Sequence, residues 1–238
     1  MPDLIRLVVG LGNPGKEYER TRHNAGFWLV ERFAAQSGAV LRKDSKFQAL
    51  VGRHGPSGAW LVLPQSFMNS SGRPVQMIAG FFKIAAAEIL VVHDEVDFPP
   101  GTAKLKLGGG IAGHNGLKDI SQRLATHDYW RLRLGVGHPG NKDAVADYVL
   151  GKPPAEDKAA IDETIARSIE VLPLCLSGDL QGAMQNLHTH EKEKPSETRP
   201  VPEKTIERKT EPALPPREEK AGGLKGLLGA LLHPGRKK

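Results

Sequence analysis

The chain alternates short apolar runs with longer segments in which apolar residues recur every three or four positions. Short apolar runs bounded by turn residues are typical of β-strands, whereas the longer spacing is typical of helices with one buried face. The pattern predicts strands at residues 4–10, 47–53, 60–64, 89–95, 103–107 and 131–137, and helices at residues 24–36, 70–82, 116–125, 142–149 and 155–175. We therefore expect an α/β fold.

Two turn-rich segments indicate how the strands are connected. The sequence is Gly-Pro-Ser-Gly at residues 55–58 and Phe-Pro-Pro-Gly at residues 98–101, and both combinations favour chain reversal. We expect each segment to act as a hairpin-like return, which requires some antiparallel pairing. The sequence thus predicts a single domain over residues 1–191, with a central mixed β-sheet flanked by helices.

The composition changes abruptly after His190. Seven of the eighteen prolines lie beyond this residue, aromatic residues vanish, and Lys and Glu alternate with Pro and Thr. Such a composition predicts a disordered C-terminal tail over residues 192–238. Its leucines can line one face of a short helix near residues 223–232, either as a solvated segment or as a contact to a membrane or a partner.

Composition and charge narrow the function classes. The 238 residues are 39% hydrophobic, enough for one sizeable core, and no apolar run approaches the roughly 18 residues of a membrane span. Without a recognisable signal peptide, we expect a cytoplasmic protein. The lone Cys175 predicts a buried apolar residue rather than a disulfide. The tail carries +5 of the net charge of +6, so nucleic-acid binding by residues 1–191 would require a local basic cluster.

The glycine pattern Gly10-x-Gly12-x-x-Gly15 follows the first predicted strand, as it does in dinucleotide-binding proteins. In that motif a helix begins immediately at the glycine loop. Residues 16–23 are instead polar and turn-like, and Pro14 offers no N–H to a phosphate. A nicotinamide-dependent oxidoreductase is therefore the least favoured alternative.

Side chains capable of chemistry gather in four loops, at residues 10–24, 66–72, 91–101 and 106–116. Loops at strand ends meet at one edge of an α/β sheet, so we expect Asn13, Asn69 and Asn115 to converge. The sequence contains no G-x-S-x-G motif, and its one cysteine lies outside these loops, so there is no obvious covalent nucleophile. We therefore expect water to attack the substrate. That attack requires a base, for which His23 is suited, and a carboxylate to hold the base, for which Asp94 is suited.

These residues also have ordinary structural explanations. Taken singly, His23 and the asparagines are more often capping or turn residues, and Asp94 is more often a turn residue. The segment "HDEVD" at residues 93–97 resembles a set of metal ligands. Strand alternation places Asp94 and Asp97 on opposite faces, however, and no second cluster completes a zinc site. We therefore expect no metal.

Basic residues form two rows. Lys104 and Lys106 alternate along one predicted strand, and Arg131 and Arg133 alternate along another. Such rows suit phosphate groups, although an ordinary solvated sheet face explains them equally well. The glycines at 108–110 either let the backbone approach a phosphate or simply make a turn.

Six motifs appear in order along the chain: "VGLGNPGKEYERTRHNAG", "FMNSSG", "HDEVDFPPG", "KLGGGIAGHNGLKDI", "RLRLGVGHPG" and "VLGKPP". Together they closely resemble the bacterial peptidyl-tRNA hydrolase family over about residues 4–190. The resemblance implies a monomeric α/β esterase that cuts the bond between a peptide and the 3′-terminal ribose of tRNA, with no metal or cofactor. Its implied partners are tRNA and the ribosome, which some peptidyl-tRNAs leave prematurely.

The resemblance also implies roles by motif position. His23 resembles the catalytic base, Asp94 the group that stabilises its basic form, and Asn13 the residue that distinguishes a blocked from a free amino group. Contacts to the tRNA end or the peptide are implied for Tyr18, Phe67, Met68, Asn69 and Asn115, and more distant phosphate contacts for Lys104, Lys106, Arg133 and Lys142.

Ile111 and Ala112 depart from the family pattern, because this part of the Gly-rich loop is often more polar or glycine-like. The tail after His190 lies outside the resemblance. A non-catalytic tRNA- or RNA-binding module on the same fold is the second hypothesis. The intact His23, Asp94 and Asn13 weigh against it.

Overall fold

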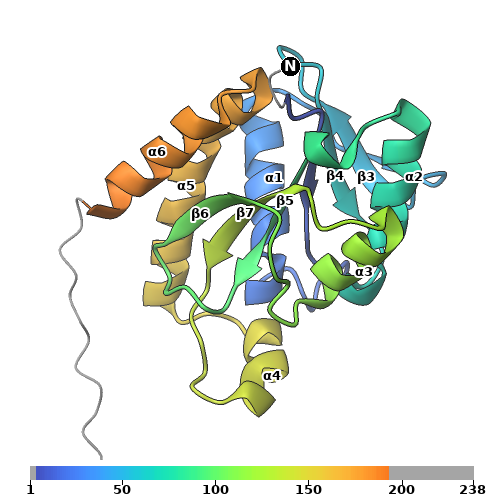
Figure 1. Cartoon of the computed structure of the whole chain (residues 1–238). Coiled ribbons are helices and arrows are strands. Elements are labelled where there is room, and N and C mark those ends of the chain that lie inside the picture. The colour runs from blue at the N-terminus through green and yellow to red at the C-terminus, as the bar shows by residue number, and fades with distance from the viewer. Residues whose placement is uncertain (1–3, 193–238) are drawn as a thin grey trace, which may run out of the picture. The chain divides into compact units, whose positions relative to one another are not determined.

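The computed structural model describes residues 4–192, and a seven-stranded mixed sheet forms the centre of this part of the chain (Figure 1). Its strands are β1 (Leu7–Gly10), β2 (Arg42–Asp44), β3 (Ala49–Arg53), β4 (Trp60–Pro64), β5 (Ile89–Glu95), β6 (Ala103–Leu107) and β7 (Trp130–Gly135), in the spatial order β2-β3-β4-β1-β5-β7-β6. Strands β4, β1, β5 and β7 run parallel, and the pairs β2-β3, β3-β4 and β6-β7 are antiparallel. The predicted mixed sheet is therefore confirmed.

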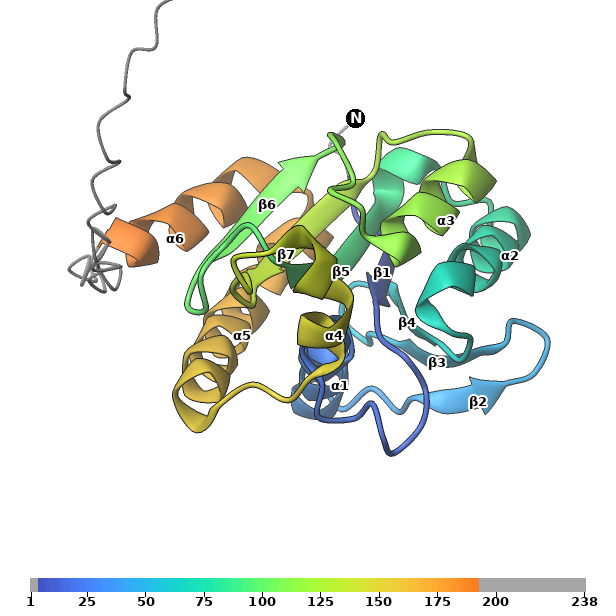
Figure 2. The ribbon, with the colours of Figure 1, turned by 90° about the horizontal axis from the view of Figure 1, so that it is seen from below.

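Helices cover both faces of the sheet. They are α1 (Ala25–Gln36), α2 (Gly72–Phe82), α3 (Asn115–Leu124), α4 (Val145–Leu150), α5 (Ala155–Ser177) and α6 (Leu180–Lys192), with short 3-10 turns η1 (Arg22–Asn24), η2 (Met68–Ser70), η3 (Ala86–Glu88) and η4 (Lys142–Ala144). Figure 2 shows α1 and α5 on one side of the sheet and α2 and α3 on the other. The helix α6 packs against β6 on the side of α5.

Strand alternation explains the two cores. Val8 of β1 and Val92 of β5 pack with residues of α1 and α5. Their neighbours Leu7 and Val91 point to the opposite face and pack with residues of α2 and α3. Because both faces of these strands are buried, the strands appear in the sequence as continuous apolar runs rather than as alternating ones.

The structure corrects three details of the predicted elements. The short strand β2 and the helix α6 are additional to those expected from the pattern. The turn at residues 55–58 does connect the antiparallel pair β3-β4. The turn at residues 98–101 does not make a hairpin, because β6 pairs with β7, which lies between it and β5.

The glycines of the first loop serve helix packing. A Cβ atom on Gly10 would overlap the backbone of Gly26 at the start of α1, and a Cβ atom on Gly12 would overlap the ring of Phe27. Their absence lets the N-terminal end of α1 lie directly against the ends of β1 and β5. This close approach, rather than a pyrophosphate, accounts for the pattern, and it brings η1 to the carboxyl edge of the sheet.

The predicted tail, including the possible helix near residues 223–232, lies outside the described residues, apart from Lys192, which ends α6. Cys175 is buried, as predicted, and burial raises the pKa of its thiol to about 12. In the part of the chain that the structure describes, no helix is long and apolar enough to cross a membrane.

Candidate active site

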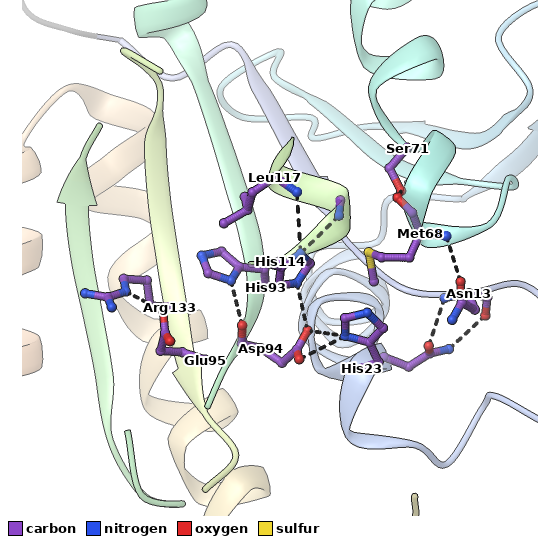
Figure 3. Close-up of polar contacts among 12 residues, drawn as sticks. Asn13, His23, Met68, Ser71, His93, Asp94, Glu95, His114, Leu117 and Arg133 are labelled. Atoms are coloured by element: carbon purple, nitrogen blue, oxygen red, sulfur yellow. Dashed lines mark hydrogen bonds and ion pairs between the residues drawn. The ribbon is translucent and has the colours of Figure 1, made fainter. Parts of the chain in front are cut away.

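The predicted pair of His23 and Asp94 lies at the carboxyl edge of the sheet. His23 comes from η1, and Asp94 is the penultimate residue of β5. The Nδ1 atom of His23 is 3.0 Å from Oδ1 and 2.9 Å from Oδ2 of Asp94 (Figure 3). Asp94 is only 3% exposed and His23 only 9%. Residues 71 positions apart thus form a buried, charge-assisted contact.

A second histidine, His114, contacts the same carboxylate. Its Nε2 atom lies 3.1 Å from Oδ1 of Asp94. His114 is also the N-cap of α3, and its Nδ1 atom accepts hydrogen bonds from the backbone N–H groups of Gly116 and Leu117. His114 is not among the site residues that the sequence predicts. The available signal was a histidine two residues before the helix predicted at residues 116–125, which does not reveal a contact to Asp94.

The hydrogen bonds assign the protons on both rings. Because Nδ1 of His114 accepts from two amides, the neutral ring must carry its proton on Nε2, which donates to Asp94. Nδ1 of His23 likewise donates to Asp94, so Nε2 of His23 keeps its lone pair. Within the described residues, this Nε2 atom makes no hydrogen bond to the protein, and His23 lines a cavity. It is therefore placed to accept a proton.

Burial and charge shift the pKa values of this group in opposite directions. Burial lowers the pKa of His23, but the charge and hydrogen bond of Asp94 outweigh it and raise that pKa above its usual value. Burial raises the pKa of Asp94, and the two histidines outweigh burial and hold that pKa well below its usual value. Asp94 is thus ionised at neutral pH, and His23 is a stronger base than a free imidazole.

The neighbouring His93 has a different environment. Burial is the main cause that lowers the pKa of His93 to about 3, so the ring is neutral. Its Nδ1 atom lies 2.6 Å from the backbone oxygen of Asp94, to which it donates. His93 therefore does not share the carboxylate of Asp94.

Asn13 is held by three hydrogen bonds in the loop after β1. Its Oδ1 atom accepts from the backbone N–H of Met68 at 2.7 Å, which leaves the NH₂ end of the amide as the group that can donate elsewhere. The side chain of Asn24 bonds both the N–H and the carbonyl oxygen of Asn13, at 2.9 and 3.0 Å. Asn13 is 6% exposed and also lines a smaller cavity of about 360 Å³ beside Phe27.

The main cavity has a volume of about 610 Å³ and opens over the His23–Asp94 pair. One wall is the segment from Ile111 to Asn115, and the other is formed by η4 and α4. Lys142 and Asn115 both line this cavity, as do the acidic residues Glu95 and Asp97.

The other predicted substrate contacts come from the loop that carries Asn13 and from the segment around η2, where the N–H of Met68 bonds Asn13. Tyr18 and Phe67 approach edge to face, with ring centroids 6.3 Å apart, and Phe67 is 60% exposed. Met68 is buried, and its side chain packs beneath Gly116, while Asn69 is exposed in the same 3-10 turn. An exposed aromatic ring next to a buried amide is a suitable platform for a nucleobase.

The predicted basic rows share one face of β6 and β7. Lys104 is directly opposite Arg133, and Lys106 is opposite Arg131. The four side chains have different environments, however. Lys106 is exposed, whereas Arg133 bonds Glu95 at 2.8 Å and stacks on Phe98, and Lys104 also lies over the Phe98 ring. Arg131 is buried and contacts backbone carbonyl groups.

The residues that can hold a metal differ from the acidic cluster considered in the sequence. Asp97 lies beyond the end of β5, and the ligand atoms that come within 4.8 Å of one another belong to His23, Asp94 and His114. Hydrogen bonds to Asp94 account for the positions of both imidazoles. The absence of a metal in the reaction stays a prediction.

A mixed α/β sheet that holds an imidazole against a buried carboxylate, beside fixed amide groups and an open cavity, is an arrangement typical of hydrolytic enzymes. Comparison with known proteins identifies the family to which the chain belongs. The chain belongs to the peptidyl-tRNA hydrolase family, whose model matches residues 7–196.

Individual relatives support this membership. The peptidyl-tRNA hydrolase of Thiobacillus denitrificans is 55% identical over 184 residues, which cover 77% of this chain and 90% of that protein. The peptidyl-tRNA hydrolase of Neisseria gonorrhoeae is 52% identical, with 79% of this chain and 100% of that protein covered. A crystal structure of peptidyl-tRNA hydrolase from Acinetobacter baumannii matches with a TM-score of 0.76 at 43% identity, over 79% of this chain and 95% of that one.

Proposed function

We propose that this protein hydrolyses the ester bond of peptidyl-tRNA, releasing the peptide and free tRNA, by water that His23 activates. The observation that carries the mechanism is the buried contact between His23 and Asp94, which leaves Nε2 of His23 as a free base at the cavity. Family membership supports the choice of substrate. No covalent intermediate is needed, because the cavity lining includes neither serine nor cysteine.

The proposed reaction has two steps. Nε2 of His23 takes a proton from water as the water oxygen attacks the ester carbonyl carbon, giving a tetrahedral oxyanion. When this intermediate collapses, the bond to the ribose oxygen breaks, and the His23 imidazolium returns the proton to that oxygen. Asp94 stabilises the imidazolium between the two steps. The NH₂ groups of the nearby asparagines are the expected donors to the oxyanion.

Asn13 provides a means of selecting blocked substrates. Its amide has a fixed orientation, because Met68 donates to Oδ1. The buried amide would pair with the first peptide group of a blocked substrate and would be left without a partner by a free amine. Leaving a buried polar group unpaired rejects the wrong substrate more strongly than the loss of an apolar contact does. This role follows the resemblance and rests on the burial of Asn13.

A single assay tests the function. Purified protein is given N-acetyl-aminoacyl-tRNA in EDTA, with unblocked aminoacyl-tRNA in a parallel reaction. We expect rapid release of the N-acetyl amino acid from the blocked substrate alone. Salt-sensitive tRNA binding without turnover would instead support the non-catalytic RNA-binding module. Turnover that EDTA abolishes and added Zn²⁺ restores would show that the reaction needs a metal, for which His23, Asp94 and His114 are the candidate ligands.

The rate should fall at acidic pH with a midpoint above the ordinary histidine value. His23 acts as a base only when neutral, and Asp94 raises its pKa above 6.5. Activity is therefore complete above that pKa and is lost as the pH falls through it. The measurement is the pH profile of kcat/KM, corrected for spontaneous ester hydrolysis. A midpoint below 6.5 would contradict the proposed electrostatics.

The face that carries Lys104, Lys106 and Arg133 is proposed to bind tRNA phosphates, with Lys142 as a further contact at the cavity. Replacing Lys106 by Gln should weaken tRNA binding and reduce the slope of log Kd against log salt by about 0.7 to 1. The matched control is Lys43→Gln, an exposed lysine on β2 at the opposite edge of the sheet. An unchanged slope for Lys106→Gln would remove this residue from the interface.

We also propose that the protein acts as a cytoplasmic monomer on peptidyl-tRNA that has left the ribosome. His23, Asp94, His114 and Asn13 all come from one chain, so the site needs no second copy. Light scattering at assay concentration tests the monomer, and fractionation with ribosomes tests the association.

A further inference from the structure

Arg131 is a buried cation that the mechanism does not use. It lies on β7 and is 3% exposed. Among the described residues it forms no ion pair with a carboxylate. Its Nη1 and Nη2 atoms instead donate to the carbonyl oxygens of Gly110 and Gly109, at 2.7 and 2.6 Å. A buried guanidinium is costly unless its donors are used, and here two of them bond consecutive carbonyl groups of one loop.

That loop leads directly into the wall of the main cavity. It begins where the N–H of Gly108 bonds the carbonyl oxygen of Tyr129 at 3.0 Å. After the two carbonyl groups held by Arg131, Ile111 packs against the core beneath α2 and α3, which explains the apolar residue at this position. The segment from Ile111 to Asn115 then lines the cavity.

The loop lacks regular structure that could hold it in place. Ala112 and Gly113 both have positive φ, 45° and 76°, in a turn closed by the hydrogen bond from His114 N–H to the carbonyl oxygen of Ile111. An L-residue such as Ala112 is strained there, so this conformation needs support from its surroundings. The two hydrogen bonds from Arg131 lie immediately before this turn and supply such support.

We propose that Arg131 is a positioning residue that fixes the loop of residues 108–113 against the sheet and thereby sets the cavity wall that meets the substrate. This inference rests on the proposed function, which places the substrate in that cavity. Arg131 contacts neither His23 nor Asp94. His114 is held separately by the amides of α3. Loss of the Arg131 contacts therefore loosens the wall and leaves the base intact.

The test compares Arg131→Gln and Arg131→Lys with the wild type in steady-state kinetics. We expect KM to rise on the order of ten-fold in Arg131→Gln, as for the loss of a charged hydrogen bond. We expect kcat to stay within about two-fold and the acidic midpoint of the pH profile to stay unchanged, because the base is not touched. Arg131→Lys keeps the positive charge but cannot donate to both carbonyl groups in the same geometry, so its KM should lie between those of the wild type and Arg131→Gln.

Hydrogen exchange supplies a readout that does not depend on turnover. In Arg131→Lys and Arg131→Gln, amide protection should fall at Gly108 and His114, whose N–H groups bond the carbonyl oxygens of Tyr129 and Ile111, and should stay unchanged in α5. Arg53→Gln, which removes an exposed arginine from β3, is the matched control and should change neither protection nor kinetics.

Two results would overturn the proposal. One is a fall in kcat at constant KM, which indicates a smaller folded fraction. The other is unchanged loop protection in both variants. If the wild type itself fails to hydrolyse blocked aminoacyl-tRNA, the proposed function fails, and the exchange data still decide whether Arg131 holds the loop.

Discussion

Replacing His23 by Ala should lower kcat by about three orders of magnitude, because a general base contributes roughly 10² to 10⁴ to such a reaction. The variant loses the imidazole whose Nε2 lone pair is available at the cavity and whose pKa Asp94 raises. Asp94 stays in place and continues to accept from His114. We therefore expect tRNA to bind with a Kd close to that of the wild type, measured by filter binding at fixed salt.

The matched control is His127→Ala, which removes an exposed histidine from the turn between α3 and β7. It should keep full activity. Wild-type turnover by His23→Ala would rule out His23 as the base. Loss of tRNA binding together with activity would indicate instead that the imidazole mainly binds substrate.

The sequence predicted the central pair of the site because chemistry and topology pointed to the same residues. Water-mediated hydrolysis needs a base with an orienting carboxylate, and Asp94 ends an apolar strand whose position in a parallel sheet is fixed by burial on both faces. The loop that carries His23 follows a neighbouring strand of the same sheet. The local pattern, together with the rule that loops at strand ends meet at one edge of an α/β sheet, was thus sufficient to predict that the two residues lie together.

His114 could not be predicted in the same way. Its contact with Asp94 depends on where the N-terminal end of α3, whose amides hold the His114 ring, lies relative to the end of β5. A glycine-rich segment before a predicted helix indicates only that a tight turn is allowed, and it does not indicate where the helix lies. The role of His114 therefore follows from tertiary geometry.

The environments of the basic residues on β6 and β7 could also be predicted only in part. Alternation correctly placed Lys104, Lys106, Arg131 and Arg133 on one face, because side chains two positions apart on a strand point the same way. It could not show that the Gly-rich loop folds back over Arg131 and leaves Lys106 exposed. Nor could it show that β7 inserts between β5 and β6, since strand order depends on long-range packing.

The second large effect is expected for Asp94→Asn, which should lower kcat by about 10³ to 10⁴ through the wrong tautomer of His23. Asp94 accepts hydrogen bonds from two imidazoles, whereas an asparagine has one acceptor and one donor group. The tautomer of His114 is fixed by the amides of α3, so its Nε2–H requires the oxygen. The NH₂ group then replaces Oδ2, the nearer of the two oxygens to Nδ1 of His23, at 2.9 Å against 3.0 Å for Oδ1, which His114 also uses.

An NH₂ group at that position favours a His23 ring with its lone pair on Nδ1 and its proton on Nε2, which cannot accept a proton from water. Loss of the negative charge also removes the interaction that raises the pKa of His23, so the acidic limb of the residual activity should move to lower pH. The measurements are kcat, the pH profile and the ring ¹⁵N shifts of His23. Asp128→Asn, which changes an exposed carboxylate outside the site, is the control and should behave as the wild type.

A double-mutant cycle with His114 tests whether the tautomer of His23 accounts for the loss of activity in Asp94→Asn. In a His114→Ala background, no second imidazole competes for the oxygen of the amide introduced by Asp94→Asn. That amide can then rotate and accept from Nδ1–H of His23, which restores the productive tautomer. Asp94→Asn should therefore cost at least ten-fold less activity in that background than in the wild type, a coupling of about 1.4 kcal/mol. Equal costs in both backgrounds would show that the charge of Asp94, and not its control of the His23 tautomer, determines the rate.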